Sequence, residues 1–309
     1  MLNSIPGAVE LGLLYALMAL GVFITFRILD FPDLTVDGSF TTGGAVAAIM
    51  LTGGHSITIS LLAAFGAGLA AGLCTGLLHT KGRVNGLLSG ILMMIALHSI
   101  NLRIMDGAPN ISVYGSDQLF SGVSPYWVKL LAIFGIILLI KLLLDAFLHT
   151  ELGLALRATG DNARMIRSFG ANTDLTKILG ISLSNGLVAL SGALIVQQSS
   201  FADISMGVGM IVIGLASVII GEAILGARTV FIATLAVIVG SVLYRIIVAL
   251  ALRIEWLDAS DLKLITALIV IIALVLPAIQ RTWKQKLLAK KRSAELTGQT
   301  GSKPIGGGF

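Results

Sequence analysis

Charged residues are scarce in this chain of 309 residues, since Asp, Glu, Lys and Arg together make up only 12% of it. In a soluble globular protein about a quarter of the residues are charged. Here 56% of the residues are hydrophobic and the mean hydropathy is +0.97. This composition excludes a water-soluble globule and predicts an integral membrane protein.

Several patterns that enzymes and cofactor-binding proteins need are missing as well. The only cysteine, Cys74, excludes an internal disulfide. No cluster of His, Cys or Asp has metal-ligand spacing, and no order of Ser, His and Asp indicates a catalytic triad. The phosphate-binding pattern G-x-x-x-x-G-K-[ST] is absent too, so we expect neither an ATP site of that kind, nor a cofactor or metal, in this chain.

Long apolar runs occupy most of the chain instead. Nine of them are long enough, or nearly so, to cross a bilayer core at about 1.5 Å per residue. They predict an all-α polytopic membrane protein with about nine transmembrane helices. The predicted spans are 7–26, 34–52, 57–79, 85–104, 126–148, 178–199, 205–222, 228–251 and 261–279.

The basic residues predict the orientation of these spans. Fifteen of the 21 Lys and Arg residues fall on one side of the predicted membrane and four on the other, the last two lying within spans. Because cytoplasmic loops are enriched in Lys and Arg, the N-terminus is predicted outside and the C-terminus in the cytoplasm. The net charge of +5 therefore reflects topology, and we expect no nucleic-acid partner. The basic tail 281–309 is expected to be disordered and to meet anionic lipid, or else a specific partner.

An internal repeat is the most informative pattern. Leu13–Asp33 matches Leu183–Asp203 at a constant offset, FPDLTV (31–36) resembles FADISM (201–206), and LSGILMMIAL (88–97) resembles ITALIVIIAL (265–274). Five spans separate corresponding helices, so two four-helix repeats, 7–104 and 178–279, would lie in opposite orientations. Such inverted repeats are typical of transport proteins. The transmembrane domain would cover 1–280, with a linking helix and cytoplasmic loop at 126–177.

Candidate pathway residues follow from the repeat and from polar groups near span ends. Asp33 and Asp203 each precede the second helix of a copy, where a carboxylate would cap free backbone N–H groups. With Thr35 and Ser205 they would alternatively line a solute path. His98 and Asn101, and Gln197 and Gln198, are further candidates, although interhelical hydrogen bonds are the commoner role of such residues.

Three other sets of charges have simpler expected roles. Lys141 and Asp145, four residues apart in one span, are expected to pair with each other. Glu222 is expected to pair with Arg228 across a tight turn, or to contact a partner protein. Arg245 lies well inside a span, which makes it a functional hypothesis, or it extends toward the membrane surface.

The cytoplasmic loop 149–177 contains a short amphipathic segment. Asp161 is predicted to cap a helix from Asn162 to Phe169, which Gly170 ends. Met165, Ile166 and Phe169 share one face, flanked by Arg164 and Arg167. A helix this short needs support, either from the lipid surface or from a groove on a soluble partner.

This loop carries the most specific resemblance. GLALRATGDNARMIRSFGANT (153–173) is similar to the coupling-helix loop of ABC importer permeases of the branched-chain amino-acid and ribose class. The run ILDFPDLTVDGSF (28–40) also fits that class, and DLKLITALIVIIALVLP (261–277) resembles permeases of tryptophan- and tyrosine-type systems. The Asn-Phe-Ala pattern of branched-chain members is replaced by Asp30-Phe31-Pro32, which leaves the substrate open.

The resemblance implies a division of labour in a bacterial inner membrane. Two such chains would pair, most simply as a homodimer, an extracytoplasmic binding protein would deliver a small polar solute such as an amino acid, and separate ATPase subunits would hold ATP and Mg²⁺. It assigns contact with the ATPase to the loop residues Arg157, Asp161, Asn162, Arg164, Met165, Ile166 and Phe169. The inverted repeat alone also allows an ion-gradient-driven transporter, and a membrane enzyme is the third possibility. The amphipathic loop favours the ABC permease over the ion-gradient-driven transporter, which has no partner to dock there. A membrane enzyme would need clustered catalytic groups at one interface, and the sequence has none.

Overall fold

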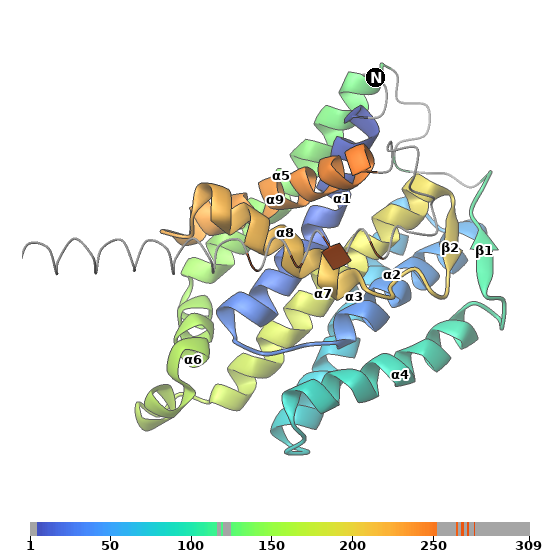
Figure 1. The fold of residues 1–309 in the computed structure, drawn as a ribbon. Helices are drawn as coiled ribbons and strands as arrows, with labels where there is room; N and C mark the ends of the chain where they lie inside the picture. The colour runs from blue at the N-terminus through green and yellow to red at the C-terminus, as the bar shows by residue number, and fades with distance from the viewer. Residues whose placement is uncertain are drawn as a thin grey trace, which may run out of the picture.

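A computed structural model describes residues 5–115, 119, 125–251 and the isolated positions 264, 267, 268, 271 and 275. The described chain is a bundle of α-helices with one small pair of strands (Figure 1). The elements are α1 (Ile5–Val22), the π-helical turn η2 (Phe23–Ile28), α2 (Thr35–Thr52), α3 (Ile57–Thr80), α4 (Gly86–Ile104), β1 (Asn110–Ser112), α5 (Tyr126–His149), α6 (Glu151–Ser168), α7 (Thr173–Ser199), β2 (Phe201–Asp203), α8 (Met210–Leu225) and α9 (Val230–Ala251).

Helices cover eight of the nine predicted ranges. The ninth, 261–279, and the tail 281–309 lie outside the described residues apart from the isolated positions. Within the described part, six segments are long and apolar enough to cross a membrane, and α8 is a shorter apolar helix. The six are Ile5–Ile28, Ile57–Thr80, Gly86–Ile104, Tyr126–His149, Thr173–Ser199 and Val230–Ala251.

Two helices form the centre of the bundle. The helices α1 and α7 are buried over most of their length, whereas α3, α4 and α5 each leave a broad apolar face exposed. The helix α7 packs against α1, α2 and α3, and α1 also packs against α9. This arrangement is that of a membrane bundle, with its polar groups inside and exposed apolar faces outside.

Glycines allow α2 to pack closely against α7 in the interior of the bundle. A Cβ added at Gly43 would collide with the backbone of Ala189 on α7, and one at Gly192 would collide with the backbone of Phe40 on α2. The two helices therefore touch backbone to backbone, as small residues allow in membrane proteins. This close contact brings the polar side chains of α2 and α7 together.

The segment between η2 and α2 turns back into the bundle. Phe31 and Asp33 are buried, whereas Asp30 has a positive φ of 51° and is exposed. In the other copy of the predicted repeat, Phe201 and Asp203 belong to β2, which pairs antiparallel with β1. The helix that follows begins only at Met210, so the predicted start at 205 is wrong. Gly209, at the N-cap with φ 85°, separates the preceding turns from α8.

Candidate functional site

A polar network at the junction of α2 and α7 is completely buried. Asn185 on α7 donates from Nδ2 to Oδ2 of Asp33 at 2.7 Å and accepts at Oδ1 from Oγ of Ser39 at 2.7 Å. The other Asp33 oxygen, Oδ1, accepts from the backbone N–H of Thr35 at 2.9 Å. All four residues have 0% exposed surface. A buried carboxylate is tolerated here because each of its oxygens accepts a hydrogen bond.

The network extends from α2 to the neighbouring helices. The hydroxyl groups of Thr35 and Thr75 lie 2.8 Å apart, which connects α2 to α3. Asn101 on α4 donates from Nδ2 to the carbonyl oxygen of Gly38 at 3.3 Å. The start of α2 is thus connected by polar contacts to three surrounding helices.

Asp203 and Asp33 have similar local contacts but different surroundings. Oδ1 of Asp203 accepts from the backbone N–H of Ser205 at 2.7 Å, the same two-residue spacing as at Asp33 and Thr35. Ser205 is exposed, however, and no helix starts there. The prediction that Asp203 caps the following helix is therefore wrong, whereas Asp33 does accept from the first N–H of α2.

The N-terminus of α8 is capped instead by Asp37 from α2. Its Oδ2 accepts from Gly209 N–H at 2.8 Å and its Oδ1 from Ile211 N–H at 2.9 Å. Nearby, the Thr41 hydroxyl accepts from Gly207 N–H at 3.1 Å. The carboxylate also faces the positive end of the α8 dipole. Asp37 thus connects the two halves of the chain, a contact that the sequence analysis did not identify.

Replacing Asp37 by alanine is expected to lower the free energy of unfolding by about 1–2 kcal/mol, because two N–H groups at the start of α8 lose their acceptor. Hydrogen exchange of the Gly209 and Ile211 amides should accelerate along with this loss. Asp30→Asn is the matched control, since Asp30 is exposed and Asn tolerates its positive φ. Unchanged exchange at Gly209 and Ile211 in the alanine variant would contradict the capping role.

A cavity of about 410 Å³ opens beside this connection. Its polar lining includes the predicted residues His98 and Asn101 together with Asp37 and Thr41. Apolar side chains complete the walls: Met94, Ile95, Ile204 and Val208. The cavity lies between α2, α4 and the turn before α8, and it provides both hydrogen-bonding groups and apolar surface, as small-solute sites do.

The other pathway candidates lie elsewhere. Gln197 accepts from Leu119 N–H at 3.0 Å, and Gln198 accepts from Nζ of Lys129 at 2.9 Å. Lys129 also forms an ion pair with Glu10, at 2.6 Å. The structure therefore places the two glutamines in a polar cluster joining the starts of α1 and α5 to the end of α7, away from the residues lining the cavity.

The cytoplasmic loop of the sequence analysis corresponds to α6 and its connection to α7. The helix is interrupted at Asn162, which has φ −158° and ψ 86°, and Oδ1 of Asn162 accepts from Met165 N–H at 3.0 Å. The helix cap is therefore Asn162, and not Asp161 as predicted, because Asn162 is the residue that leaves helical geometry. Met165 is 47% and Phe169 78% exposed.

The remaining loop residues divide into two groups. Arg164 is exposed and Ile166 is half-buried, both in the short segment after the break, which also contains Met165 and Phe169. Arg157 and Asp161 precede the break or lie at it, and they line a separate cavity with Arg27 and Glu222. Of the seven predicted coupling residues, Arg157 and Asp161 therefore line a cavity that the other five do not.

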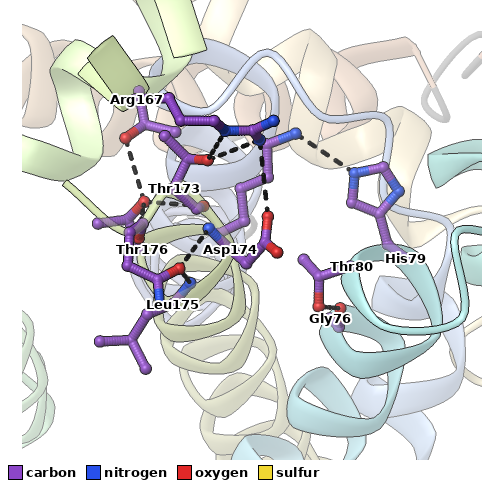
Figure 2. A network of polar contacts seen from close by, with 11 residues as sticks. Gly76, His79, Thr80, Arg167, Thr173, Asp174, Leu175 and Thr176 are labelled. Atoms are coloured by element: carbon purple, nitrogen blue, oxygen red, sulfur yellow. Dashed lines mark hydrogen bonds and ion pairs between the residues drawn. The ribbon is translucent and has the colours of Figure 1, made fainter. Parts of the chain in front are cut away.

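A polar network links the end of α6 to α7 and α3 (Figure 2). Arg167 donates from Nε and Nη2 to Oγ1 of Thr173, at 3.2 and 2.8 Å, and lies 3.8 Å from the Asp174 carboxylate. One turn further along α7, Lys177 Nζ lies 3.3 Å from Nε2 of His79 on α3. The short helical segment is therefore tied to the first turn of α7, the same helix that carries Asn185.

Three expectations about charged residues have clear outcomes. The pairing of Lys141 with Asp145 is confirmed, at 2.5 Å. The predicted pair of Glu222 with Arg228 is wrong, because Glu222 pairs with Arg27 at 2.8 Å, a partner 195 residues away. Arg245 forms no ion pair with a carboxylate of the described residues. It stacks over the Tyr15 ring on α1, 3.6 Å from the ring centroid, as a cation–π contact.

The long apolar helices with polar groups in the interior define a multi-pass membrane protein, and comparison with known proteins gives its family. Residues 6–275 match the family described as branched-chain amino acid transport system / permease component. The chain belongs to this family of ABC-type permeases, which confirms the resemblance seen in the sequence.

Individual relatives differ in the solute that their names give. The chain is 43% identical to a tyrosine transport system permease protein of Clostridioides difficile over 296 residues, covering 96% of each. It is 28% identical to the ribose import permease protein of Escherichia coli over 216 residues, covering 67% of this chain and 65% of that one. A solved metal-chelate type ABC transporter in an inward-facing conformation shares 20% identity, with a TM-score of 0.47 and coverage of 85% of this chain and 80% of that one.

Proposed function

We propose that this chain is the membrane-spanning subunit of an ATP-driven importer that moves an amino acid across the inner membrane of a bacterium. The family supports a permease, and the tyrosine-system relative at 43% identity supports an amino-acid substrate. The cavity beside Asp37 is chemically suitable as part of the path. Its Asp37, His98 and Asn101 side chains suit the charged ends of an amino acid, and its apolar walls suit an apolar or aromatic side chain.

An importer of this kind needs further protein subunits beside the permease. An ATPase subunit in the cytoplasm would bind ATP and Mg²⁺, and an extracytoplasmic binding protein would deliver the substrate. A second copy of the permease would complete the path. Alternating access then requires two states of the bundle whose balance the ATPase shifts.

The observation that carries the coupling proposal is the break in α6 at Asn162. The break separates a short helical segment, residues 163–168, from the first part of α6. Two large apolar side chains are exposed here, Met165 within the segment and Phe169 at its C-cap. Exposed anchors of this kind fit a groove on a partner protein. Because Arg167 ties the segment to Thr173, movement of the segment would be passed to α7 and to Asn185.

The double variant Met165→Asp, Phe169→Asp is expected to lose at least about 100-fold in affinity for the ATPase. Two apolar side chains that become buried when the partner binds contribute about 2 kcal/mol each. The measurement is co-purification of the permease with its candidate ATPase, followed by titration. Both side chains are exposed, so the variant should fold normally, which elution volume and thermal unfolding will show.

Two control variants separate apolar contact from charge. Met165→Leu, Phe169→Leu keeps the apolar face and should retain binding. Lys81→Asp adds a carboxylate at an exposed position outside α6 and should also retain it. Undiminished ATPase binding by the double Asp variant would overturn the coupling role, whereas a native chain that binds no ATPase would overturn the proposed function itself.

A further inference from the structure

A second cavity, of about 300 Å³, lies between the end of η2, the middle of α6 and the turn joining α8 to α9. Five of its eleven lining residues are charged, and it is separate from the cavity beside Asp37. The polar groups on its walls are Arg27, Arg157, Asp161, Glu222, Arg228 and Thr229.

Two guanidinium groups of this cavity, those of Arg157 and Arg228, have donors that are free to bind a ligand. Arg27 and Glu222 neutralise each other through their 2.8 Å ion pair. Nε of Arg157 is buried and has no hydrogen-bond partner among the described residues. Arg228 is exposed and makes no hydrogen bond or ion pair within the described part of the chain. Asp161 is the one further carboxylate on the wall, so the lining carries a net positive charge.

The start of α9 adds donors to the same cavity. Val230 and Ala233, in its first turn, line the wall, and Thr229 precedes them. The hydroxyl oxygen of Thr229 accepts from Ile232 N–H at 3.3 Å, which leaves the earlier N–H groups of this long helix available. The positive end of the helix dipole therefore reinforces the two arginines.

Exposed apolar side chains adjoin these donors. Ile224 and Leu225 at the end of α8 are 59% and 42% exposed, and Phe231 at the start of α9 is 50% exposed. Arg228 lies between them in the sequence, on the side of the membrane where most basic residues gather. A positively charged cavity beside exposed apolar surface matches a ligand with an anionic head and a hydrocarbon tail.

We propose that this cavity binds the phosphate group of an anionic phospholipid. Guanidinium groups bind phosphate oxygens in a bidentate manner, which suits the free donors of Arg157 and Arg228. A soluble phosphate would use the same donors but would gain nothing from Ile224, Leu225 and Phe231. The site is independent of the transported substrate, and it would connect lipid composition to the middle of α6.

The test titrates the full-length chain in neutral detergent with dioctanoyl phosphatidylglycerol, dioctanoyl phosphatidylcholine and inorganic phosphate, and native mass spectrometry counts the bound lipid. The native chain is expected to prefer phosphatidylglycerol. Arg157→Gln, Arg228→Gln should lower its affinity for that lipid by about tenfold or more, because hydrogen bonds to charged groups contribute about 1.5–3 kcal/mol. Arg228→Gln alone should give a smaller loss of lipid affinity. Because Arg228 is exposed in a turn, this variant should fold as the native chain does.

The control variant Lys81→Gln, Arg83→Gln removes the same charge from exposed positions elsewhere and should leave the affinity unchanged. Equal losses in both double variants would show general charge attraction and overturn the site. Displacement of the lipid by equimolar inorganic phosphate would identify a soluble anion as the ligand and overturn the lipid assignment. Unchanged lipid binding with loss of ATPase binding in Arg228→Gln would reassign the cavity to the partner protein.

Discussion

Replacing Lys141 by methionine is expected to cost about 3–5 kcal/mol of unfolding free energy, because it leaves the Asp145 carboxylate buried without its counter-ion. Lys141 is completely buried on α5, and its Nζ lies 2.5 Å from Asp145 and 3.1 Å from the centroid of the Phe231 ring on α9. Asp145 also accepts from Oγ1 of Thr234 on α9, at 2.7 Å. These contacts attach α5, a helix with a broad exposed face, to the bundle.

The double variant Lys141→Met, Asp145→Leu should recover most of this loss, since it removes both charges and fills the space with apolar groups. Thr234 then keeps its hydrogen bond to the backbone oxygen of Val230. Unfolding in mixed micelles of neutral and denaturing detergent measures both effects. A double variant as unstable as Lys141→Met would contradict the view that the unpaired carboxylate causes the loss.

Replacing Asn185 by aspartate should abolish transport and lower the unfolding free energy by about 3–5 kcal/mol, because two carboxylates would then face each other in a fully buried site. The donor that Asp33 Oδ2 now uses, Nδ2 of Asn185 at 2.7 Å, would be lost. Substrate uptake and unfolding in mixed micelles are the two readouts.

The exchanged pair Asp33→Asn, Asn185→Asp separates charge repulsion from loss of a specific residue. In the exchanged pair one amide and one carboxylate still face each other, Thr35 N–H still has an acceptor, and Ser39 can still donate to position 185. Only the hydrogen bond from Asn185 to the Ile181 carbonyl oxygen is lost. Stability should therefore return to within about 1 kcal/mol of the native chain. Failure of the exchange to restore stability would contradict the network as described.

Most of the helices were predictable from the long apolar segments. A segment that crosses a bilayer must satisfy its backbone hydrogen bonds internally, and an α-helix does so. The pairing of Lys141 with Asp145 was predictable for a related reason, since both lie on one face of one helix. The start of α8 was not, because apolar residues already begin at Ile204 while the backbone there is held by Asp37, which lies 172 residues from Gly209.

Partners from distant segments explain the other differences. Glu222 had a cation nearby in sequence, Arg228, yet the fold brings Arg27 closer. Asn185 and Thr75 resemble the isolated polar residues common in packed membrane helices, and only their contacts with Asp33 and Thr35 mark them as parts of a network. Asp37, in the first turn of α2, follows Asp33 by four residues, so a second carboxylate close to the start of the helix was the available signal. The inverted repeat as a whole stays a prediction, because the second copy extends into 261–279.

Uptake of labelled amino acids into proteoliposomes tests the central claim most directly. The permease would be reconstituted with its ATPase and binding protein, and uptake would be compared with ATP on the ATPase side, with a non-hydrolysable analogue, and with a proton or sodium gradient alone. The account predicts uptake against a gradient only with hydrolysable ATP, and none when Met165→Asp, Phe169→Asp replaces the native chain. Uptake by the permease alone, driven by an ion gradient without ATP, would contradict it and identify a secondary transporter.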